Sequence, residues 1–215
     1  MEAAGEEALT SGHYYRPRSR RGPRRLISDH IRGVTVEFYV SSDVFSPDEV
    51  DTGTRLLIEH AEVPDKGVVL DLGCGYGAIG ITLAKAYPGL RVVMVDINPR
   101  AVELAKLNAR HNGVDDRVTV LHGNLYEPVE GMEFNVIISN PPLAAGMATI
   151  EEIIRGAPRH LAQGGTLQLV MRKGANRALE LMMDVFGDAR VALRKKGYTI
   201  LYAKKQSREP RGENQ

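Results

Sequence analysis

The feature that most constrains this chain is a glycine-rich turn placed between a buried strand and a helix. Residues 68–70 form a continuous apolar run, typical of a strand buried on both faces of a parallel sheet. The run ends at Asp71, and Gly73, Gly75 and Gly77 follow at alternate positions. Glycine has no Cβ, so the backbone of this turn can approach a ligand closely. A helix is expected over residues 78–86, with its free N–H groups directed at the turn. The stretch therefore predicts a nucleotide-type cofactor site.

Two cofactors are compatible with parts of this pattern. Residues 75–80 satisfy the dinucleotide pattern G-x-G-x-x-G. Asp96 follows at about the sequence separation at which a dinucleotide-binding fold places the acidic residue that holds the ribose. A dinucleotide, however, would bring its pyrophosphate close to Asp71, and the two negative charges would repel each other. The spacing Asp71-x-Gly73-x-Gly75-x-Gly77 instead resembles the first motif of class I S-adenosylmethionine (AdoMet) methyltransferases. AdoMet carries an ammonium and a sulfonium, which favour a nearby carboxylate, so AdoMet is the expected cofactor.

The order of predicted elements indicates an α/β fold. Strands and helices alternate along the chain, which predicts a doubly wound parallel sheet with helices on both faces. The last two strands are separated only by a short turn that includes residues 195–197, so they are expected to form an antiparallel hairpin. The result is a seven-stranded, mostly parallel, Rossmann-like sheet that resembles the class I methyltransferase architecture. The expected strands are 68–71, 91–96, 117–121, 134–139, 166–171, 189–193 and 198–203; the helices that follow the glycine turn are 78–86, 99–112, 149–161 and 175–186.

Charge and composition divide the chain into three segments. We expect a basic, disordered arm over residues 1–30, a methyltransferase domain over 31–205 and a polar tail over 206–215. From His13 to Arg32 the chain has seven arginines and one acidic residue, although its net charge is only +1. Such an arm is either a solvated tail or a contact for nucleic acid. If it is a contact, the RNA-binding arginines are Arg16, Arg18, Arg20, Arg21, Arg24 and Arg25.

Composition also indicates the compartment. The single cysteine, Cys74, excludes an internal disulfide framework and favours a reducing environment. The first twelve residues are acidic and polar, unlike a signal peptide, and no apolar run approaches the length of a membrane span. We therefore expect a cytoplasmic protein without membrane partners. No metal is expected either, because the sulfonium of AdoMet is already an excellent leaving group. Cys74 itself is interpreted as a small residue that fits the turn, because no partner base is apparent.

Residues at the carboxyl ends of the strands are the cofactor candidates, because ligands of open α/β sheets bind there. Asp96 is expected to accept both ribose hydroxyls. Asn124 either pairs with the adenine edge, since its amide both donates and accepts, or is an ordinary turn residue. Ile97 and Leu125 could supply apolar cover for the adenine ring.

The sequence Asn140-Pro141-Pro142 is the second strong signal. It follows an apolar strand, in the position where a methyl acceptor must meet the sulfonium, so Asn140 is assigned to both the cofactor and the acceptor side. It resembles the N-P-P-[FYW] motif of methyltransferases that act on amino groups conjugated to a ring or carbonyl. Such a nitrogen is a poor nucleophile. The Asn140 side-chain oxygen and the Pro141 carbonyl can accept its two N–H bonds, and the prolines hold that carbonyl rigidly.

Taken together, the motifs resemble the methyltransferase small domain family over residues 32–205, and especially its RsmC-type ribosomal RNA guanine-N2 methyltransferases. The resemblance implies that Phe45, Thr52 and Gly53 close over AdoMet. Leu143 stands where the motif has an aromatic residue, so stacking of the target base cannot be carried over. Bacterial RsmC proteins have two such domains, and the single domain is closer to archaeal-type relatives. The arginine arm could replace the RNA contacts of a second domain.

The leading interpretation is an enzyme that methylates an exocyclic amino group of an RNA base, most simply guanine N2 in ribosomal RNA or tRNA. A protein glutamine N5-methyltransferase is the nearest alternative, followed by a DNA adenine methyltransferase and a non-catalytic AdoMet- and RNA-binding module. A dehydrogenase is disfavoured because the chain lacks the length for a second dinucleotide half and a substrate domain. The oligomeric state stays open.

Overall fold

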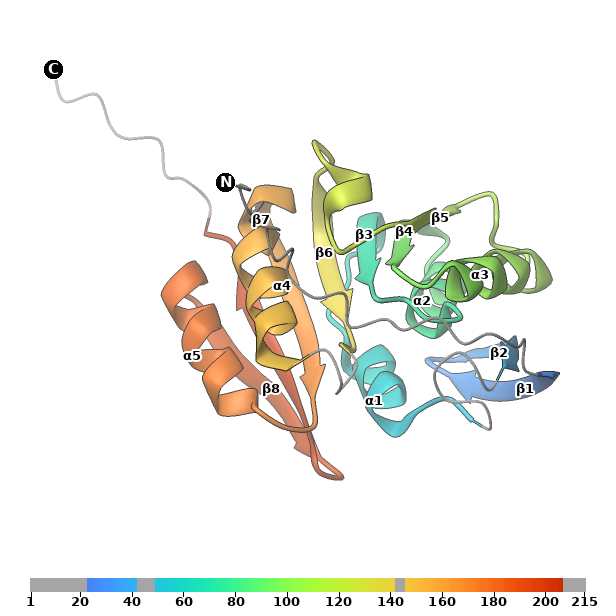
Figure 1. The fold of residues 1–215 in the computed structure, drawn as a ribbon, viewed down its shortest axis with the longest axis horizontal. Helices are drawn as coiled ribbons and strands as arrows, with labels where there is room; N and C mark the ends of the chain where they lie inside the picture. The colour runs from blue at the N-terminus through green and yellow to red at the C-terminus, as the bar shows by residue number, and fades with distance from the viewer. Residues whose placement is uncertain (1–22, 42–48, 142–145, 207–215) are drawn as a thin grey trace, which may run out of the picture.

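The computed structural model describes residues 23–41, 49–141 and 146–206 (Figure 1). The described part of the chain begins with a hairpin of two strands and one helix, and then alternates between strand and helix. The elements are β1 (Arg24–Ile31), β2 (Val34–Ser41), α1 (Thr52–His60), β3 (Lys66–Leu72), α2 (Ala78–Ala86), β4 (Gly89–Asp96), α3 (Pro99–His111), β5 (Val118–His122), η1 (Glu127–Val129), β6 (Phe134–Ser139), α4 (Gly146–His160), β7 (Leu161–Met171), α5 (Ala175–Phe186), β8 (Ala189–Lys195) and β9 (Tyr198–Lys204).

The main sheet has seven strands in the order β5-β4-β3-β6-β7-β9-β8. The five strands from β5 to β7 run parallel, whereas β9 is antiparallel to both of its neighbours, β7 and β8. The predicted doubly wound sheet with its C-terminal antiparallel hairpin is therefore confirmed. The chain winds outward from β3 to β5 and then returns to β6 on the other side of β3. This reversal creates a crevice-forming switch point between the carboxyl ends of β3 and β6.

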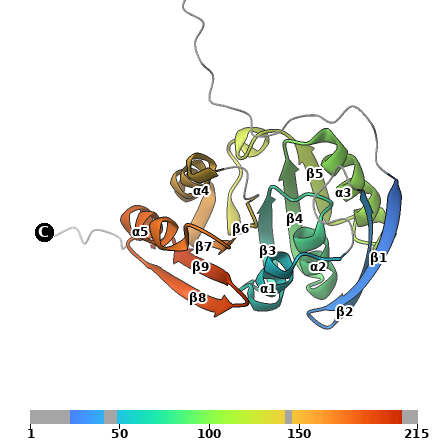
Figure 2. The same ribbon diagram turned by 60° about the horizontal axis from the view of Figure 1, so that its bottom comes forward.

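Successive residues of the central strands are buried on opposite faces of the sheet. In β3, Val69 packs into one apolar core and Leu70 into the other, and both side chains are fully buried. The first core is closed by α1, α2 and α3, and the second by α4 and α5. Figure 2 shows α4 and α5 on one side of the sheet, with α1 and α2 on the other. Burial on both faces explains why residues 68–70 read as an uninterrupted apolar run.

The β1–β2 hairpin forms a separate two-stranded sheet that lies outside the helices of the first core (Figure 2). The Asn108 side chain of α3 accepts from the Tyr39 amide at 2.7 Å and donates to the Tyr39 carbonyl at 3.0 Å. Asn112 donates in the same way to the Glu37 carbonyl at 2.7 Å. Phe38 is fully buried, with its ring 5.4 Å from that of Tyr76. The side-chain amides of Asn108 in α3 and of its C-cap Asn112 thus continue the hydrogen bonding of the β2 edge.

The prediction of disorder over residues 24–30 was wrong. These residues form β1, which pairs with β2 from Arg24 opposite Ser41 to Ile31 opposite Val34. Arg24 and Arg25 are therefore exposed residues of a strand, and the folded part begins before residue 31. The density of arginines suggested a solvated arm, but the strand is held by its partner residues 34–41. The other arm arginines, Arg16, Arg18, Arg20 and Arg21, lie outside the described residues.

One element boundary also differs from the prediction. β7 begins at Leu161 and includes Gly164 and Gly165, whereas the expected strand begins at residue 166. The register between β6 and β7 shifts at Phe134 and Val136, which accommodates these glycines within the strand. A Cβ on Gly165 would lie 2.9 Å from the Ala162 carbonyl oxygen, so this irregularity requires a residue without a side chain.

Candidate active site

The switch point brings the two sequence motifs together. The glycine turn follows β3 and Asn140 follows β6, and the two strands are adjacent and parallel. The Ser139 hydroxyl donates to the Leu72 carbonyl at 2.7 Å, which joins the two strand ends directly. The predicted cofactor turn and acceptor motif therefore leave the same edge of the sheet from neighbouring strands.

The glycine turn is held by the end of β4. The amides of Gly73 and Cys74 both donate to the Val95 carbonyl, at 2.8 and 3.1 Å. Gly73 and Gly75 have φ values of +70° and +58°, which disfavour other residues. A Cβ on either would meet no heavy atom within 4 Å, so both face open space. These two glycines leave the free backbone surface that a bound cofactor requires.

Gly77 has a structural role in the turn. Its φ of +95° makes it the N-terminal cap of α2. A Cβ there would lie 2.7 Å from the Ile81 side chain and 3.3 Å from that of Met94. Gly77 therefore allows the turn to pack closely against α2 and β4. Direct contact between Gly77 and the cofactor stays a prediction.

Asp71 is fully buried beneath the turn. Its Oδ2 accepts from the Gly80 amide at 3.0 Å, and its Oδ1 has no hydrogen-bond partner in the described part of the chain. Burial raises the pKa of Asp71 to about 7, and the nearby charge of Asp96 adds to this, while the Gly80 N–H opposes it. The structure shows Asp71 holding the first turns of α2; its predicted contact with AdoMet stays untested.

Asp96 joins the turn to the next helix. Its Oδ2 accepts from the Gly75 amide and its Oδ1 from the Asn98 amide, each at 2.8 Å. Burial raises the pKa of Asp96, whereas these two N–H groups and His122 act in the opposite direction. Each carboxylate oxygen has a second lone pair, so the predicted ribose contact is compatible with both hydrogen bonds. Asn98 caps α3 by accepting from the Arg100 amide at 3.0 Å.

The predicted adenine residues lie in the loops that follow β4 and β5. Ile97 is half-buried, and its carbonyl lies 3.0 Å from His122 Nε2. The Asn124 carbonyl accepts from the Glu127 amide at 3.0 Å, and Leu125 has a φ of +44°. Asn124 is thus part of a tight turn, while its predicted side-chain contact with adenine stays a prediction.

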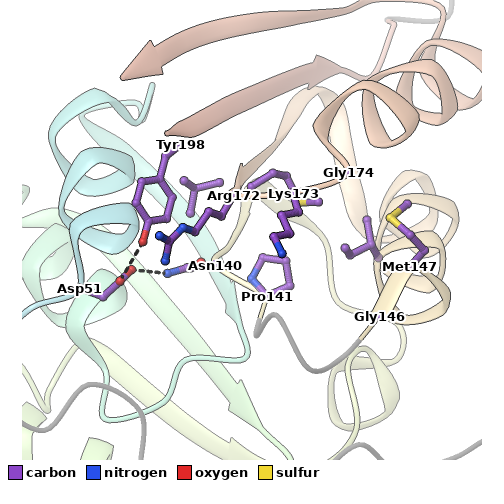
Figure 3. A pocket seen from close by; sticks show the side chains of 12 residues that line it. Asp51, Asn140, Pro141, Gly146, Met147, Arg172, Lys173, Gly174 and Tyr198 are labelled. Atoms are coloured by element: carbon purple, nitrogen blue, oxygen red, sulfur yellow. Dashed lines mark hydrogen bonds between the residues drawn. The ribbon is translucent and has the colours of Figure 1, made fainter. Parts of the chain in front are cut away.

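Beside the switch point lies a pocket of about 390 Å³ (Figure 3). Its apolar wall comes from α4 and β7, and the exposed cations Arg172 and Lys173 stand where β7 ends. Asn140 and Pro141 open onto it, and their role in binding the methyl acceptor stays a prediction. The lining residues are Asp51, Asn140, Pro141, Gly146, Met147, Ile150, Val170, Met171, Arg172, Lys173, Gly174 and Tyr198.

The Asn140 amide is fixed by α1. Its Nδ2 donates to Asp51 Oδ2 at 3.1 Å and to Thr54 Oγ1 at 2.8 Å. Sequence reasoning did not assign a role to Asp51, Thr54 or Tyr198. The only signal was that Asp51 and Thr54 flank Thr52 and Gly53, which the family resemblance assigned to the cofactor.

Some predicted site residues are placed differently or are not described. Gly53 packs against Tyr198, because a Cβ on Gly53 would lie 2.6 Å from Tyr198 Cε1. Thr52 is the first residue of α1, and the predicted closure of Thr52 and Gly53 over the cofactor stays a prediction. Phe45, Pro142 and Leu143 lie outside the described residues.

Cys74 has the properties of a structural residue. It is buried and unpaired, and burial raises the pKa of its thiol well above the ordinary value. Such a thiol is protonated and unreactive at neutral pH. Within the described ranges no three His, Cys, Asp or Glu side chains gather as metal ligands. No helix in the same ranges is long and apolar enough to cross a membrane.

The sheet order, the glycine turn at the end of β3 and the Asn-Pro motif at the end of β6 define a class I methyltransferase architecture, whose cofactor is AdoMet. The methyltransferase small domain family matches residues 35–202. The chain therefore belongs to the methyltransferase small domain family. The family, fold and cofactor class expected from the sequence are confirmed.

Relatives and solved structures agree with this assignment. The "Uncharacterized protein YbxB" of Bacillus subtilis is 38% identical over 200 residues, which cover 91% of this chain and 99% of that protein. "Ribosomal RNA small subunit methyltransferase C" of Escherichia coli is 38% identical over 144 residues, 65% of this chain and 40% of that enzyme. The chain thus spans well under two thirds of that enzyme's length.

A solved structure with 28% identity and a TM-score of 0.75 covers 85% of this chain and 51% of its own. It is described as the T. thermophilus 16S rRNA N2 G1207 methyltransferase (RsmC) in complex with AdoMet and guanosine. This chain corresponds to about half of that enzyme.

Proposed function

We propose that this protein transfers a methyl group from AdoMet to the exocyclic N2 amino group of a guanine in RNA, most simply ribosomal RNA. The observation that carries the proposal is the Asn140 amide, held by Asp51 and Thr54 at the mouth of a pocket beside the glycine turn. An amide fixed in this way presents a preorganised acceptor to an incoming amino group.

The open space at Gly73 and Gly75, together with the Asp96 carboxylate, fits the proposed cofactor. When bound there, AdoMet supplies a methyl group on an excellent leaving group. The residues of the chain then have to orient the acceptor nitrogen. The Asn140 side-chain oxygen and the Pro141 carbonyl accept its two N–H bonds, which leaves the lone pair free to face the methyl group.

The rest of the pocket suits a nucleoside within a polyanion. Met147, Ile150 and Val170 offer apolar surface to a base, and the exposed Arg172 and Lys173 stand at the rim. Cations at the mouth favour a phosphate backbone over an uncharged peptide, which disfavours the glutamine-methylating alternative. The names of the E. coli and T. thermophilus relatives support ribosomal RNA and guanine as the substrate. Such a substrate agrees with the expected cytoplasmic location.

The test is methylation of RNA by the purified full chain. Unmodified 16S ribosomal RNA transcripts and small subunits lacking this methylation are incubated with AdoMet, and their nucleosides are analysed by mass spectrometry. N2-methylguanosine is the expected product. Formation of N6-methyladenosine, or methylation of glutamine in added ribosomal protein with none in RNA, would refute the proposal.

Asn140→Ala should lower turnover on the order of a hundredfold or more, while the calorimetric AdoMet affinity stays within about twofold, because one preorganised acceptor is lost. Asn135→Ala is the matched control. Asn135 lies in β6, the strand that precedes Asn140, and its side-chain oxygen accepts from the Val68 amide at the other end of the strand. Its turnover should match that of the wild type. Unchanged turnover in Asn140→Ala would contradict the amino-group mechanism.

A further inference from the structure

We propose that Asp51 is the positioning residue that sets the orientation of the Asn140 amide, so that the amide oxygen and not its nitrogen meets the acceptor amino group. The inference rests on the proposed function. It concerns a residue outside the cofactor turn and outside the Asn-Pro motif, at the N-terminal cap of helix α1 beside the pocket.

The direction of the amide follows from its partners. Asn140 Nδ2 lies 3.1 Å from Asp51 Oδ2 and 2.8 Å from Thr54 Oγ1, so both of its N–H bonds have acceptors. An ionised carboxylate only accepts hydrogen bonds. The flipped amide would place its oxygen against the Asp51 carboxylate, and the two would repel each other. Figure 3 shows the Asn140 nitrogen turned toward Asp51, which leaves the oxygen at the other end of the amide.

Asp51 is itself held from two sides. As the N-terminal cap of α1, its Oδ2 accepts from the Thr54 amide at 3.0 Å. Its Oδ1 lies 3.3 Å from the hydroxyl of Tyr198, at the start of β9. Burial and the charge of Asp51 raise the pKa of Tyr198, so the hydroxyl keeps the proton that it donates. The carboxylate is therefore a fixed acceptor between α1 and β9.

The packing of Tyr198 depends on a residue without a side chain. A Cβ on Gly53 would lie 2.6 Å from Tyr198 Cε1, so glycine lets the ring lie against the first turn of α1. The Arg172 guanidinium lies 5.7 Å from the centre of the same ring. Three elements distant in sequence, α1, β6 and β9, thus converge on the Asp51 carboxylate (Figure 3).

The orientation matters because the acceptor amino group is a hydrogen-bond donor. When the amide oxygen faces the substrate, Asn140 accepts one N–H bond of the acceptor amino group. When the amide nitrogen faces the substrate, two donors meet and the hydrogen bond is lost. Removal of the Asp51 carboxylate leaves the flip free, because Thr54 Oγ1 can either accept or donate. We therefore expect Asp51 to act on turnover through Asn140, and not on AdoMet binding.

The test is a double-mutant cycle measured by single-turnover transfer of tritiated methyl groups from AdoMet to the 16S ribosomal RNA transcript. Asp51→Ser keeps a good N-cap for α1 but is too short and uncharged to hold the Asn140 amide. Alone, it should lower the rate about tenfold while the AdoMet affinity stays within about twofold. In the Asn140→Ala background it should lower the rate no further, because the group through which it acts is already absent.

Thr54→Val supplies a second arm of the cycle if Asp51→Ser does not fold. It removes the other acceptor of the Asn140 amide with little change of volume, so a smaller loss of about threefold is expected, again only when Asn140 is present. A full rate in Asp51→Ser, an equal loss in both backgrounds or a loss of AdoMet affinity would each overturn the inference. A full rate in Asn140→Ala alone would instead refute the proposed function. The two failures are therefore distinguishable.

Discussion

Replacement of Asp71 by asparagine should remove a specific pH dependence from the stability of the protein. The wild-type carboxyl group is fully buried, and its pKa rises from the ordinary 3.8 to about 7, mainly through burial. Between these values the folded state holds a proton that the unfolded state has released. Because the unfolded state then binds fewer protons, the free energy of unfolding falls as pH rises, by up to about 1.4 kcal/mol per pH unit.

Over the whole window this loss is on the order of 4 kcal/mol, and it levels off above the folded pKa, where both states are ionised. Asparagine has no proton to lose, and its oxygen still accepts from the Gly80 amide that Asp71 holds at 3.0 Å. Its nitrogen would occupy the position of the unpartnered Oδ1, at a cost of roughly 1–3 kcal/mol. The variant is therefore expected to be weaker than the wild type at pH 5 and to equal or exceed it at pH 8.

The assay is urea denaturation of both proteins without cofactor at pH 5, 6, 7 and 8. In the difference in the free energy of unfolding between variant and wild type, the contributions of all other titrating groups cancel, apart from their coupling to Asp71. We expect this difference to shift in favour of asparagine by about 2–4 kcal/mol from pH 5 to pH 8. A difference that stays constant across this range would show that Asp71 is ionised in the folded state at pH 5, which would refute the reasoning.

Three further predictions concern the cofactor and the RNA. Gly75→Ala should weaken AdoMet binding at least tenfold by calorimetry. Gly113 has a φ of +67°, similar to the +58° of Gly75, and Gly113→Ala should cost only about 1–2 kcal/mol of stability. Asp96→Ala should cost roughly 2–4 kcal/mol of AdoMet binding through lost charge-assisted bonds; unchanged affinity would contradict the assignment. Arg24→Gln with Arg25→Gln should lower the salt dependence of RNA binding by up to about two units of slope in fluorescence anisotropy, without changing AdoMet affinity.

The sequence by itself determined the local parts of this fold. The apolar run before Asp71 predicted a strand buried on both faces, and alternating strand and helix signals predicted a doubly wound parallel sheet, because each depends on a few adjacent residues. The positive φ values of Gly73 and Gly75 are equally local, since they follow from the absence of a Cβ. The cap of α3 is local as well, because the Asn98 side chain accepts from the Arg100 amide two residues further along the chain.

Only the tertiary structure decided which of these residues meet. β1 forms because residues 24–31 pair with residues 34–41, an arrangement that the arginine content of the segment concealed. The separate roles of the glycines depend on what a Cβ would touch, which is open space at Gly75 and the Ile81 side chain at Gly77. Asp51, Asn140 and Tyr198 are far apart in the chain and make hydrogen bonds only after α1, β6 and β9 pack together. The orientation of the Asn140 amide is therefore a property of the assembled fold, because the partners that set it are supplied by α1.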